Sequence, residues 1–409
     1  MSNIPKRKED EYEEALPTNI PAYELPSDEP LGVLEPVAFF NGAMPTGVTV
    51  SHKGRIFVNF PKWGDDVRFS VAEILNNSNN SNNSNNNLGN IVAYPNESVN
   101  KTNQEDQAST LVSVQSVVVD PADRLWILDT GSPLFKPTEF GGPKIICVDL
   151  NTNQITKKIL FPQSIALPTT YLNDIRFDLR RGNEGMAFIT DSSQNGPNGI
   201  IVVDLASGES WRRLNNHPST KAEDMQTFLP VVEGRPFLDY HQLQQKQNGK
   251  IKQGANMGSD GIAISADGSR LYYCPLGSRK LYSVSTDALT DRNIPEQEIA
   301  ATIVDHGDKG GASDGLESDS EGNIYLTNYE HNSIARLRQS DKTWETIVHD
   351  PRLLWPDTLS LAIDGYLYVT ANQLHRQPRF NKDGKDLRHK PYSLFRIRVG
   401  IKPVLLKNK

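Results

Sequence analysis

The stretch GASDGLESDSEGNIYL, residues Gly311–Leu326, is the clearest copy of a pattern that recurs along the chain. It places Ser-Asp-Gly before a short apolar run, then an acidic residue and glycine, then a second apolar run. A near copy, MGSDGIAISADGSRLY, occupies Met257–Tyr272. Short apolar runs on either side of a turn signal are typical of β-hairpins. The pattern therefore predicts one hairpin, used repeatedly.

Four weaker copies share the order of an opening polar residue, an apolar run, a turn and a second run. They are Thr46–Val58, Gln115–Leu128, Asn173–Thr190 and Pro356–Tyr368. Each of the six copies is followed by further strand-like runs that complete four strands, but the last copy is one strand short. Leu34–Phe40 is an unassigned strand that can supply it. We therefore predict an all-β fold, a six-bladed β-propeller closed by an N-terminal strand.

Four segments set the domain organisation. Residues 1–30 are polar and proline-rich, so we expect a disordered tail. The propeller then spans residues 31–404, with the outer strand of its fourth blade expected at Glu298–Val304. Residues 76–87, NNSNNSNNSNNN, are a low-complexity insertion in an outer loop. Residues 217–256 lack a clear period and are expected to form a long loop insertion, either a lid or a surface loop.

Composition narrows the expected partners and location. The 409-residue chain has a formal net charge of -7 and no cluster of basic residues interleaved with aromatic ones, so nucleic acid is not expected. No apolar run approaches the roughly 20 residues of a membrane span. The chain starts with charged residues where a signal peptide has an apolar core, and Cys147 and Cys274 imply no disulfide framework. We expect a cytoplasmic monomer, with secretion after non-standard processing left open.

The residue that opens each copy is the main candidate for function. The innermost strand of a propeller blade begins at the rim of the central channel, so these side chains should converge there. They are Thr46, Gln115, Asn173, Asp260, Asp314 and Asp357. Like charges held together repel one another unless a cation is present, which favours a hard divalent ion or a ligand ammonium group. A single Asp before Gly is more often a turn residue that caps backbone N–H groups.

Loops after the second strand of each blade should emerge at the same face. Trp63 and Tyr329 are candidates to provide a flat wall for a ring, and His331 and His375 are candidates for a general acid or base. The remaining substrate-binding candidates are Gln115, Asp191, Asn328, Asp357 and Asn372. No GxGxxG or P-loop occurs in a supporting context, so no nucleotide cofactor is expected, and the absence of GxSxG disfavours Ser-His-Asp hydrolysis.

Several strings resemble the major royal jelly protein/Yellow family from about Leu34 onward, among them GRIFVNFPKW, DRLWILDTG and WPDTLSLAIDGYLYVTANQLH. The resemblance implies a six-bladed propeller and one of several roles: isomerisation of dopachrome, binding of biogenic amines, storage or signalling. The Asp-Gly copies are also similar to gluconolactonase/senescence-marker-protein propellers, which implies one divalent metal, Ca²⁺ above others. Matched by blade, Asn173, Asp260 and Asp314 fall on ligand positions, but Thr46 stands where that group has Glu.

The leading hypothesis is an enzyme acting on a small cyclic or aromatic metabolite at the channel mouth. It would perform lactone hydrolysis or a dopachrome-type isomerisation. Asn173, Asp260 and Asp314 would hold a Ca²⁺-like ion that polarises a substrate oxygen. A carboxylate or His331 would move the proton. One alternative is a non-catalytic binder of aromatic amines. Another is a cyclase or pericyclase of secondary metabolism, whose pocket holds one substrate conformer.

Overall fold

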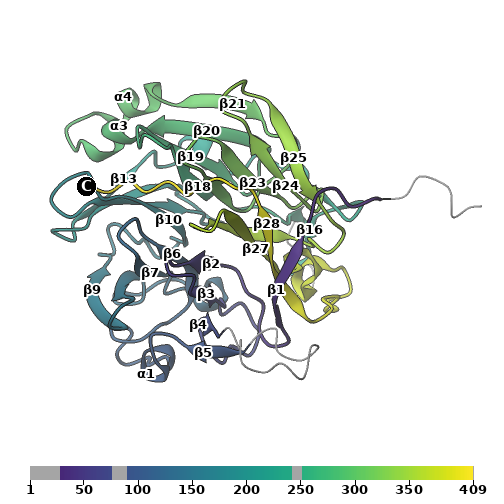
Figure 1. The fold of residues 1–409 in the computed structure, drawn as a ribbon, viewed down its shortest axis with the longest axis horizontal. Coiled ribbons are helices and arrows are strands. Elements are labelled where there is room, and N and C mark those ends of the chain that lie inside the picture. Colours follow the sequence, from purple (N-terminus) through teal and green to yellow (C-terminus); the bar gives the residue numbers. More distant parts are fainter. Residues whose placement is uncertain (1–27, 76–89, 242–250, 409) are drawn as a thin grey trace, which may run out of the picture.

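The computed structural model describes residues 28–75, 90–241 and 251–408. Strands make up 39% of it and helices 8%, in six blades around a central channel (Figure 1). The predicted Asn/Ser insertion at residues 76–87 lies outside the described residues, as does nearly all of the predicted tail at 1–30. Among the residues that are described, no helix is both long enough and apolar enough to cross a membrane.

Each blade is an antiparallel sheet of four strands, ordered from the channel outward. Blade 1 comprises β2 (Val48–Val50), β3 (Ile56–Asn59), β4 (Val71–Ile74) and β5 (Ile91–Ala93). Blade 2 comprises β6 (Val114–Val119), β7 (Arg124–Asp129), β8 (Lys144–Asp149) and β9 (Gln154–Leu160). Blade 3 comprises β10 (Leu172–Asp178), β11 (Met186–Asp191), β12 (Gly199–Asp204) and β13 (Ser210–Arg213).

The second half of the ring repeats this arrangement. Blade 4 comprises β18 (Ser259–Ile264), β19 (Arg270–Pro275), β20 (Lys280–Ser285) and β21 (Val304–Asp308). Blade 5 comprises β22 (Leu316–Ser318), β23 (Ile324–Asn328), β24 (Ser333–Leu337) and β25 (Trp344–His349). Blade 6 comprises β26 (Pro356–Leu361), β27 (Tyr366–Ala371), β28 (Tyr392–Arg398) and β1 (Glu35–Phe40).

The remaining elements lie in connections. Two small hairpins pair β14 (Val231–Val232) with β15 (Arg235–Pro236), and β16 (Leu238–Asp239) with β17 (Lys252–Gln253). The helices among the described residues are α1 (Glu97–Asn100), α3 (Thr286–Thr290) and α4 (Glu296–Ala301). Single 3₁₀ turns are η2 (Pro133–Phe135), η3 (Pro218–Thr220), η4 (Leu374–Arg376) and η5 (Pro378–Phe380).

Closure of the ring agrees with the prediction. The inner strands contact one another in the order β2, β6, β10, β18, β22 and β26, and β26 contacts β2 again. The N-terminal strand β1 pairs with β28, with Phe40 opposite Tyr392, and so supplies the fourth strand of blade 6. The six-bladed propeller closed by an N-terminal strand is therefore confirmed.

The outer strand of blade 4 was predicted wrongly. Glu298–Val304 lies largely in α4 rather than in a strand, and the true outer strand is β21. Pro295 begins the helix, Glu296 and Glu298 lie in its first turn, and Ile299 is its buried contact. Acidic side chains at a helix N-terminus are favoured by the helix dipole, which explains the local preference.

Apolar residues on both faces of the strands hold neighbouring blades together. Trp126 and Leu128 of blade 2 pack with Ile175 and Phe177 of blade 3 in one buried cluster. Strands covered on both faces read as continuous apolar runs, and β12, GIIVVD, is buried over all but its last residue. The rigid stack of blades fixes where each inner strand begins, and therefore where the opening residues lie.

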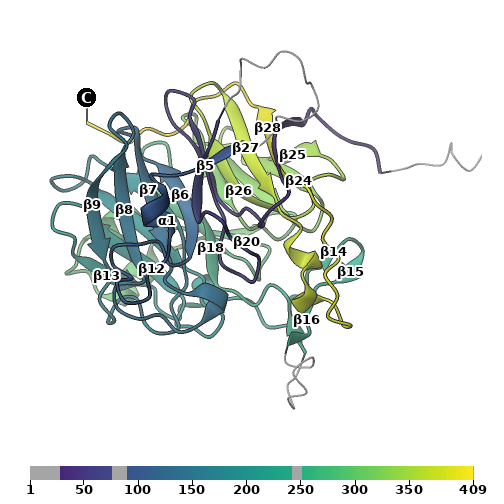
Figure 2. The ribbon, with the colours of Figure 1, turned by 90° about the horizontal axis from the view of Figure 1, so that it is seen from below.

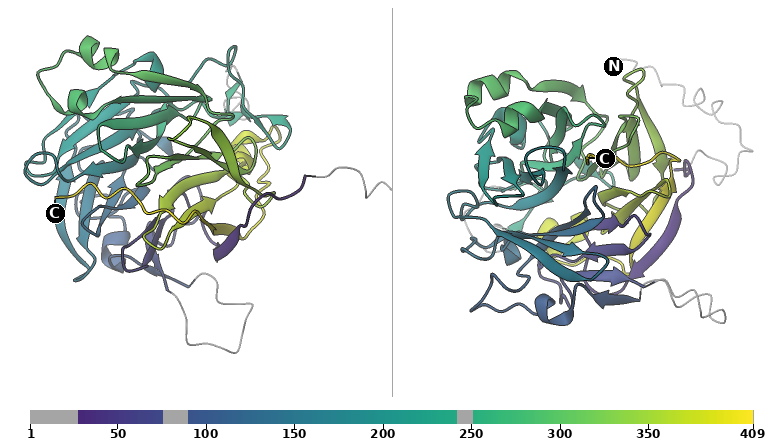
Figure 3. Two further views of the ribbon diagram at one scale, coloured as in Figure 1. Left: turned by 45° about the horizontal axis from the view of Figure 1, so that its top comes forward. Right: turned by 60° about the vertical axis from the view of Figure 1, so that its left-hand side comes forward.

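The two ends of the channel differ. The hairpins β14–β15 and β16–β17 lie on one face of the ring and the C-terminus lies on the other (Figure 2). The C-terminal segment crosses the channel end (Figure 3), and its contacts run from blade 5 to blade 3. The Ser320 N–H donates to the Lys402 carbonyl at 2.9 Å, and the Leu179 N–H donates to the Leu406 carbonyl at 2.8 Å. The face with the hairpins is where the inner strands begin.

Candidate functional site

Most inner strands carry an irregularity where they begin. The pairing register shifts between Val114 and Ser116, between Leu172 and Ile175, between Ser259 and Ile262, and between Pro356 and Leu359. A β-bulge leaves residues out of the ladder and redirects their side chains. The residues within these four bulges include Gln115, Asn173, Asp174, Asp260 and Asp357. In these four blades, the bulge therefore turns the side chain of the opening residue out of the sheet.

Threonines at the ends of second strands hold these irregular segments. The Thr327 hydroxyl accepts the N–H groups of Asp314, at 3.1 Å, and Gly315, at 2.9 Å. The Thr190 hydroxyl donates to the Asp260 carbonyl at 2.7 Å and so ties blade 3 to blade 4. These bonds satisfy backbone groups that lie outside the ladder, in the bulge of blade 4 and directly before the inner strand of blade 5.

The glycine of Ser-Asp-Gly lets adjacent inner strands approach closely. A Cβ on Gly261 would lie 2.4 Å from the Asp314 carbonyl oxygen, and a Cβ on Gly315 would lie 2.4 Å from that of Asp357. Only glycine tolerates backbone this close. The tripeptide thus brings the carboxyl groups of blades 4, 5 and 6 together.

The opening residues meet around one small cavity of about 10 Å³. Its lining comprises Gln115, Asn173, Asp174, Asp260, Gly261, Asp314, Gly315, Asp357 and Thr358. A cavity of that size holds about one water molecule. Five of the six predicted opening residues are therefore brought together. Thr46 is not in the lining: its buried hydroxyl donates to the Gln115 carbonyl at 3.2 Å and accepts from Asn59 at 2.8 Å.

Each of the three carboxyl groups is held by a neutral N–H donor. Asn173 Nδ2 donates to Asp260, Trp355 Nε1 donates to Asp314 Oδ2 at 2.7 Å, and Asn372 Nδ2 donates to Asp357 Oδ2 at 2.6 Å. Within the described ranges, none of these carboxyl groups forms an ion pair with Lys, Arg or His. Asp174, by contrast, pairs with Arg176 at 2.8 Å. Three buried acids therefore share one cavity without a cationic side chain between them.

Burial gives the three acids unequal affinities for protons. Burial, reinforced by the charges of Asp314 and Asp357, raises the pKa of Asp260 well above its usual range. Burial beside Asp314 does the same to the pKa of Asp357. Burial raises the pKa of Asp314 to about 6, opposed by the indole N–H of Trp355. The three acids therefore hold their protons with unequal affinity, Asp314 the least tightly, so a base and an acid can be divided among them.

Trp355 is a site residue that the sequence reasoning missed. It is fully buried, stacks on Tyr329 with centroids 4.1 Å apart and packs edge-on against Phe237 at 5.0 Å. Its backbone has φ of 58°, in the left-handed region that a bulky side chain rarely adopts. Strain of this kind concentrates at functional sites. Trp355 directly precedes Pro356-Asp357, which opens the sixth copy of the repeat, and this position was the sequence signal that could have identified it.

Tyr171 is a second missed residue, and it connects Trp63 to the cavity. Trp63 Nε1 donates to the Tyr171 hydroxyl at 2.7 Å, and that hydroxyl donates to Gln115 Oε1 at 3.0 Å. Phe135 stacks on Trp63 with centroids 5.4 Å apart and on Tyr171 at 4.9 Å. Trp63 therefore reaches the site through Tyr171 rather than directly.

The described part of the 217–256 segment packs over these aromatic residues. Phe237 contacts Trp355, and the carboxylate of Glu233 lies 2.6 Å from His375 Nε2. Burial lowers the pKa of His375, although Glu233 opposes the change. Tyr329 is held by its own hydroxyl, which donates to the Leu276 carbonyl at 2.7 Å. The insertion, Tyr329 and His375 thus form one layer beside the site.

Three other candidates lie away from the cavity lining. Asp191 is buried and accepts from the Tyr171 N–H at 2.9 Å and from Arg212 at 2.7 Å. It therefore anchors the connection that leads into β10. Asn328 donates to the Gly310 carbonyl at 3.1 Å. His331 is exposed in the turn after β23, where its carbonyl lies 2.8 Å from the His349 ring nitrogen. Their predicted roles in substrate binding and proton transfer stay predictions.

The donors present do not complete the predicted calcium ligand set. Asn173 turns its N–H group, not its oxygen, towards Asp260, and the Thr46 hydroxyl is engaged within the wall. Over residues 28–75, 90–241 and 251–408, no group of three His, Cys, Asp or Glu side chains is arranged to hold a metal ion. The acids are instead held by N–H donors.

Comparison with known proteins identifies the family. The model of the family described as "Major royal jelly protein" matches residues 112–392. Major royal jelly protein 7 of Apis mellifera is 29% identical over 211 residues, covering 50% of this chain and 42% of that protein. L-dopachrome tautomerase yellow-f of Drosophila melanogaster is 25% identical over 355 residues, covering 81% and 74%. The chain thus spans less than half the length of the royal jelly protein it matches.

Solved structures agree on the fold. A calcium-binding regucalcin from Agrobacterium tumefaciens has a TM-score of 0.52 at 13% identity, covering 91% of this chain and 96% of that one. At that identity the likeness concerns the fold alone. The predicted cytoplasmic location is wrong, because the matched royal jelly and Yellow proteins are secreted, extracellular proteins. Because the family model matches residues 112–392, which are more than half of the chain, this chain belongs to the major royal jelly protein family.

Proposed function

We propose that the protein isomerises a small cyclic or quinone-like metabolite by proton transfer at the acid ring formed by Asp260, Asp314 and Asp357. The observation that carries this proposal is the grouping of three buried carboxyl groups, of unequal proton affinity, around one cavity. A tautomerisation needs a base to remove one proton and an acid to deliver another. Two relatives named as tautomerases, of L-dopachrome and of dopaminechrome, support the choice of reaction.

The proposed chemistry assigns one role to each acid. The Asp314 carboxylate removes a proton from a ring carbon, and the electron pair of that C–H bond moves into the ring. Asp260 or Asp357 gives its proton to the ring oxygen, so the product is an isomer of the substrate. To restore the starting state, Asp314 must then lose the proton that it gained, and the acid that gave its proton must regain one. General acid–base catalysis of this kind contributes about 10²–10⁴-fold to the rate.

The position of the aromatic side chains favours a flat substrate. Tyr171 and Trp355 directly precede the inner strands β10 and β26, so they lie on the mouth side of the acids. The cavity of about 10 Å³ does not admit a ring, so the ring binds on the mouth side and presents one edge to the acids. An entering ring displaces part of the layer that Phe237 and Trp355 form.

A non-catalytic binder of aromatic amines is the second candidate. It is favoured by one observation, the set of acids without a basic partner among the described residues. An ammonium group would neutralise the set, and an attached ring would pack on the aromatic layer. In that case the ligand binds saturably and leaves unchanged.

The test is turnover of dopachrome and dopaminechrome, followed by loss of their visible absorbance, with a lactone as comparison substrate. Asp314→Asn should lower kcat by about 10²-fold or more, because the base is removed. Asp66→Asn, at an exposed carboxylate that is not part of the cavity lining, is the control and should not change the rate. Saturable binding without turnover would favour the binder, and an active Asp314→Asn variant would contradict the proposed base.

A further inference from the structure

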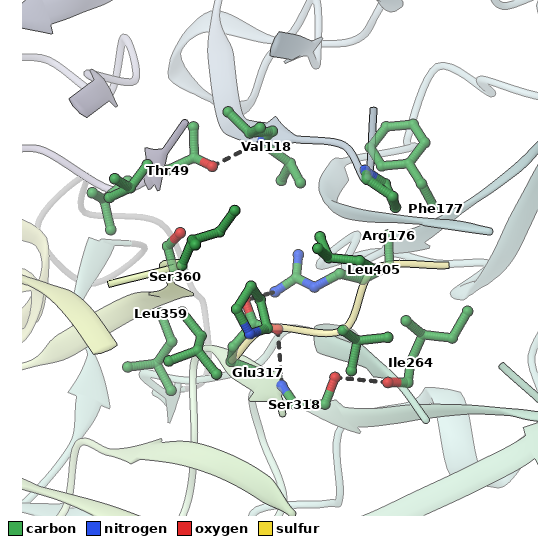
Figure 4. Close-up of a pocket in the computed structure, with 18 of the residues that line it drawn as sticks. Thr49, Val118, Arg176, Phe177, Ile264, Glu317, Ser318, Leu359, Ser360 and Leu405 are labelled. Atoms are coloured by element: carbon green, nitrogen blue, oxygen red, sulfur yellow. Dashed lines mark hydrogen bonds and ion pairs between the residues drawn. The ribbon is translucent and has the colours of Figure 1, made fainter. Parts of the chain in front are cut away.

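A second cavity, of about 70 Å³, occupies the same channel on the side of the C-terminal segment. Every blade contributes to its lining through the later part of its inner strand, and Pro403, Val404 and Leu405 close its outer side. Figure 4 shows Arg176 and Glu317 facing each other here, with Thr49 and Ser360 on other blades. The volume corresponds to roughly five water molecules.

Polar groups within this lower cavity indicate that it holds water. Arg176 is buried and bonds Asp174 and the Leu316 carbonyl, yet its Nε has no hydrogen-bond partner among the described residues. The carboxyl of the half-buried Glu317 lies 3.9 Å from Arg176. Buried polar groups left unpaired by protein are usually satisfied by ordered water. The half-buried His52 lies near the solvent end of the same lining.

Thr358 stands between the lower cavity and the acid ring. Among the described residues it is the one that lines both cavities. Its hydroxyl donates to Asp357 Oδ1 at 3.1 Å. The matching positions after the opening residues of blades 4 and 5 are Gly261 and Gly315, which have no side chain. Blade 6 therefore places a hydroxyl where blades 4 and 5 leave space.

The other polar side chains at this level are already engaged. Ser116 donates to Asp174 at 2.6 Å, and Asp174 also accepts from Arg176 at 2.8 Å. Thr358 differs from Ser116 because it lines both cavities and donates to Asp357 of the acid ring. Its hydroxyl has one proton to donate and two lone pairs that can accept. While it donates to Asp357, it retains lone pairs that accept from a water molecule in the lower cavity.

We propose that Thr358 is a proton relay that connects the acid ring to solvent through the lower cavity. The proposal rests on the proposed function and adds the route by which the acids recover their protons while a substrate covers the mouth. In the relay step the Thr358 hydroxyl passes its proton to Asp357 Oδ1 and takes one from a water molecule. The hydroxyl is unchanged after the step, and solvent replaces the proton that the water lost.

The first test compares Thr358→Val, which removes the hydroxyl at nearly constant shape, with Thr358→Ser, which keeps it. Turnover by Thr358→Val should fall on the order of tenfold in kcat with KM unchanged, and its solvent deuterium isotope effect should increase. Thr358→Ser should restore the wild-type kcat. Thr156→Val, on the exposed strand β9, controls for the same substitution outside the channel. Equal kcat in the Val and Ser variants would overturn the relay.

A second test needs no turnover, so it separates the relay from the proposed reaction. On transfer into D₂O, the infrared C=O stretch of the protonated Asp357 shifts as its proton exchanges, and Asp357→Asn identifies the band. Exchange should be slower in Thr358→Val than in the wild type or Thr358→Ser. If all three exchange at one rate, the relay is wrong, whether or not the protein is a tautomerase. Slow exchange without turnover would support the relay and refute only the reaction.

Discussion

Replacing Trp355 with phenylalanine removes one hydrogen bond from the proposed base and keeps an aromatic ring in the layer. The indole Nε1 lies 2.7 Å from Asp314 Oδ2 and favours the charged form of that carboxyl, whose pKa burial raises to about 6. A hydrogen bond to a charged group is worth about 1.5–3 kcal/mol. Since about 1.4 kcal/mol corresponds to one pKa unit, the variant should have an Asp314 pKa of about 7–8.

The sign of the effect on activity follows from the role of Asp314 as base. The reaction needs the carboxylate, so kcat/KM falls as the pH falls through its pKa. In Trp355→Phe the acidic limb should move upward by ~1–2 pH units, with a roughly two- to tenfold loss at pH 7 and recovery at higher pH. The assay is the pH profile of kcat/KM, with the Asp314 titration followed by carbon NMR as an independent readout.

The matched control is Tyr329→Phe. It removes a hydroxyl from the ring stacked on Trp355, but that hydroxyl bonds the Leu276 carbonyl and not Asp314. Both variants should lose some thermal stability, and only Trp355→Phe should move the acidic limb. A Trp355→Phe profile that overlies the wild type would refute the assignment of Asp314 as the base held by Trp355.

Three further predictions concern the acid ring and its support. Asp260→Asn should raise Tm at pH 8 while reducing turnover: the pKa of Asp260 is raised in the folded protein, so its contribution to stability is present at low pH and lost as the pH rises through that pKa. An unchanged difference in Tm between pH 5 and pH 8 would contradict this. Gly315→Ala should destabilise the fold by ~1–3 kcal/mol in urea unfolding, because the new Cβ meets the Asp357 carbonyl at 2.4 Å. Gly42→Ala, with nothing within 4 Å, should be nearly neutral, and similar losses for both would refute the close-approach argument. Calorimetric titration should show weak Ca²⁺ binding at pH 6 that strengthens as the pH rises, because binding requires the acids to lose protons. Tight binding independent of pH would refute the assigned protonation states.

The repeats determined how much of this structure could be predicted. Because each copy opens an inner strand, the convergence of Asn173, Asp260, Asp314 and Asp357 followed from counting blades, as did the need for Leu34–Phe40 to close the ring. The sequence placed Thr46 in the same set, but its hydroxyl is hydrogen-bonded to the Asn59 side chain and to the Gln115 carbonyl and does not reach the cavity. Periodicity specifies a register position and does not specify the hydrogen bonds made there.

Residues outside the repeats were less predictable. Trp355 and Tyr171 lie in connections, where no period applies, and their partners Asp314 and Gln115 are far away in sequence. His331 and Tyr329 lie two residues apart in one loop, yet one is exposed and the other fully buried. A turn sends neighbouring side chains in opposite directions, and only the packing of adjacent loops decides which one faces the site.

The most direct test of the account is an infrared count of protonated carboxyl groups at neutral pH in the wild type and in Asp260→Asn, Asp314→Asn and Asp357→Asn. The account predicts buried carboxylic acid C=O bands in the wild type, with one lost in Asp260→Asn, one lost in Asp357→Asn and none lost in Asp314→Asn. A wild-type spectrum without such bands, or a band that disappears with Asp314, would contradict the claim that one base and two acids share the channel cavity.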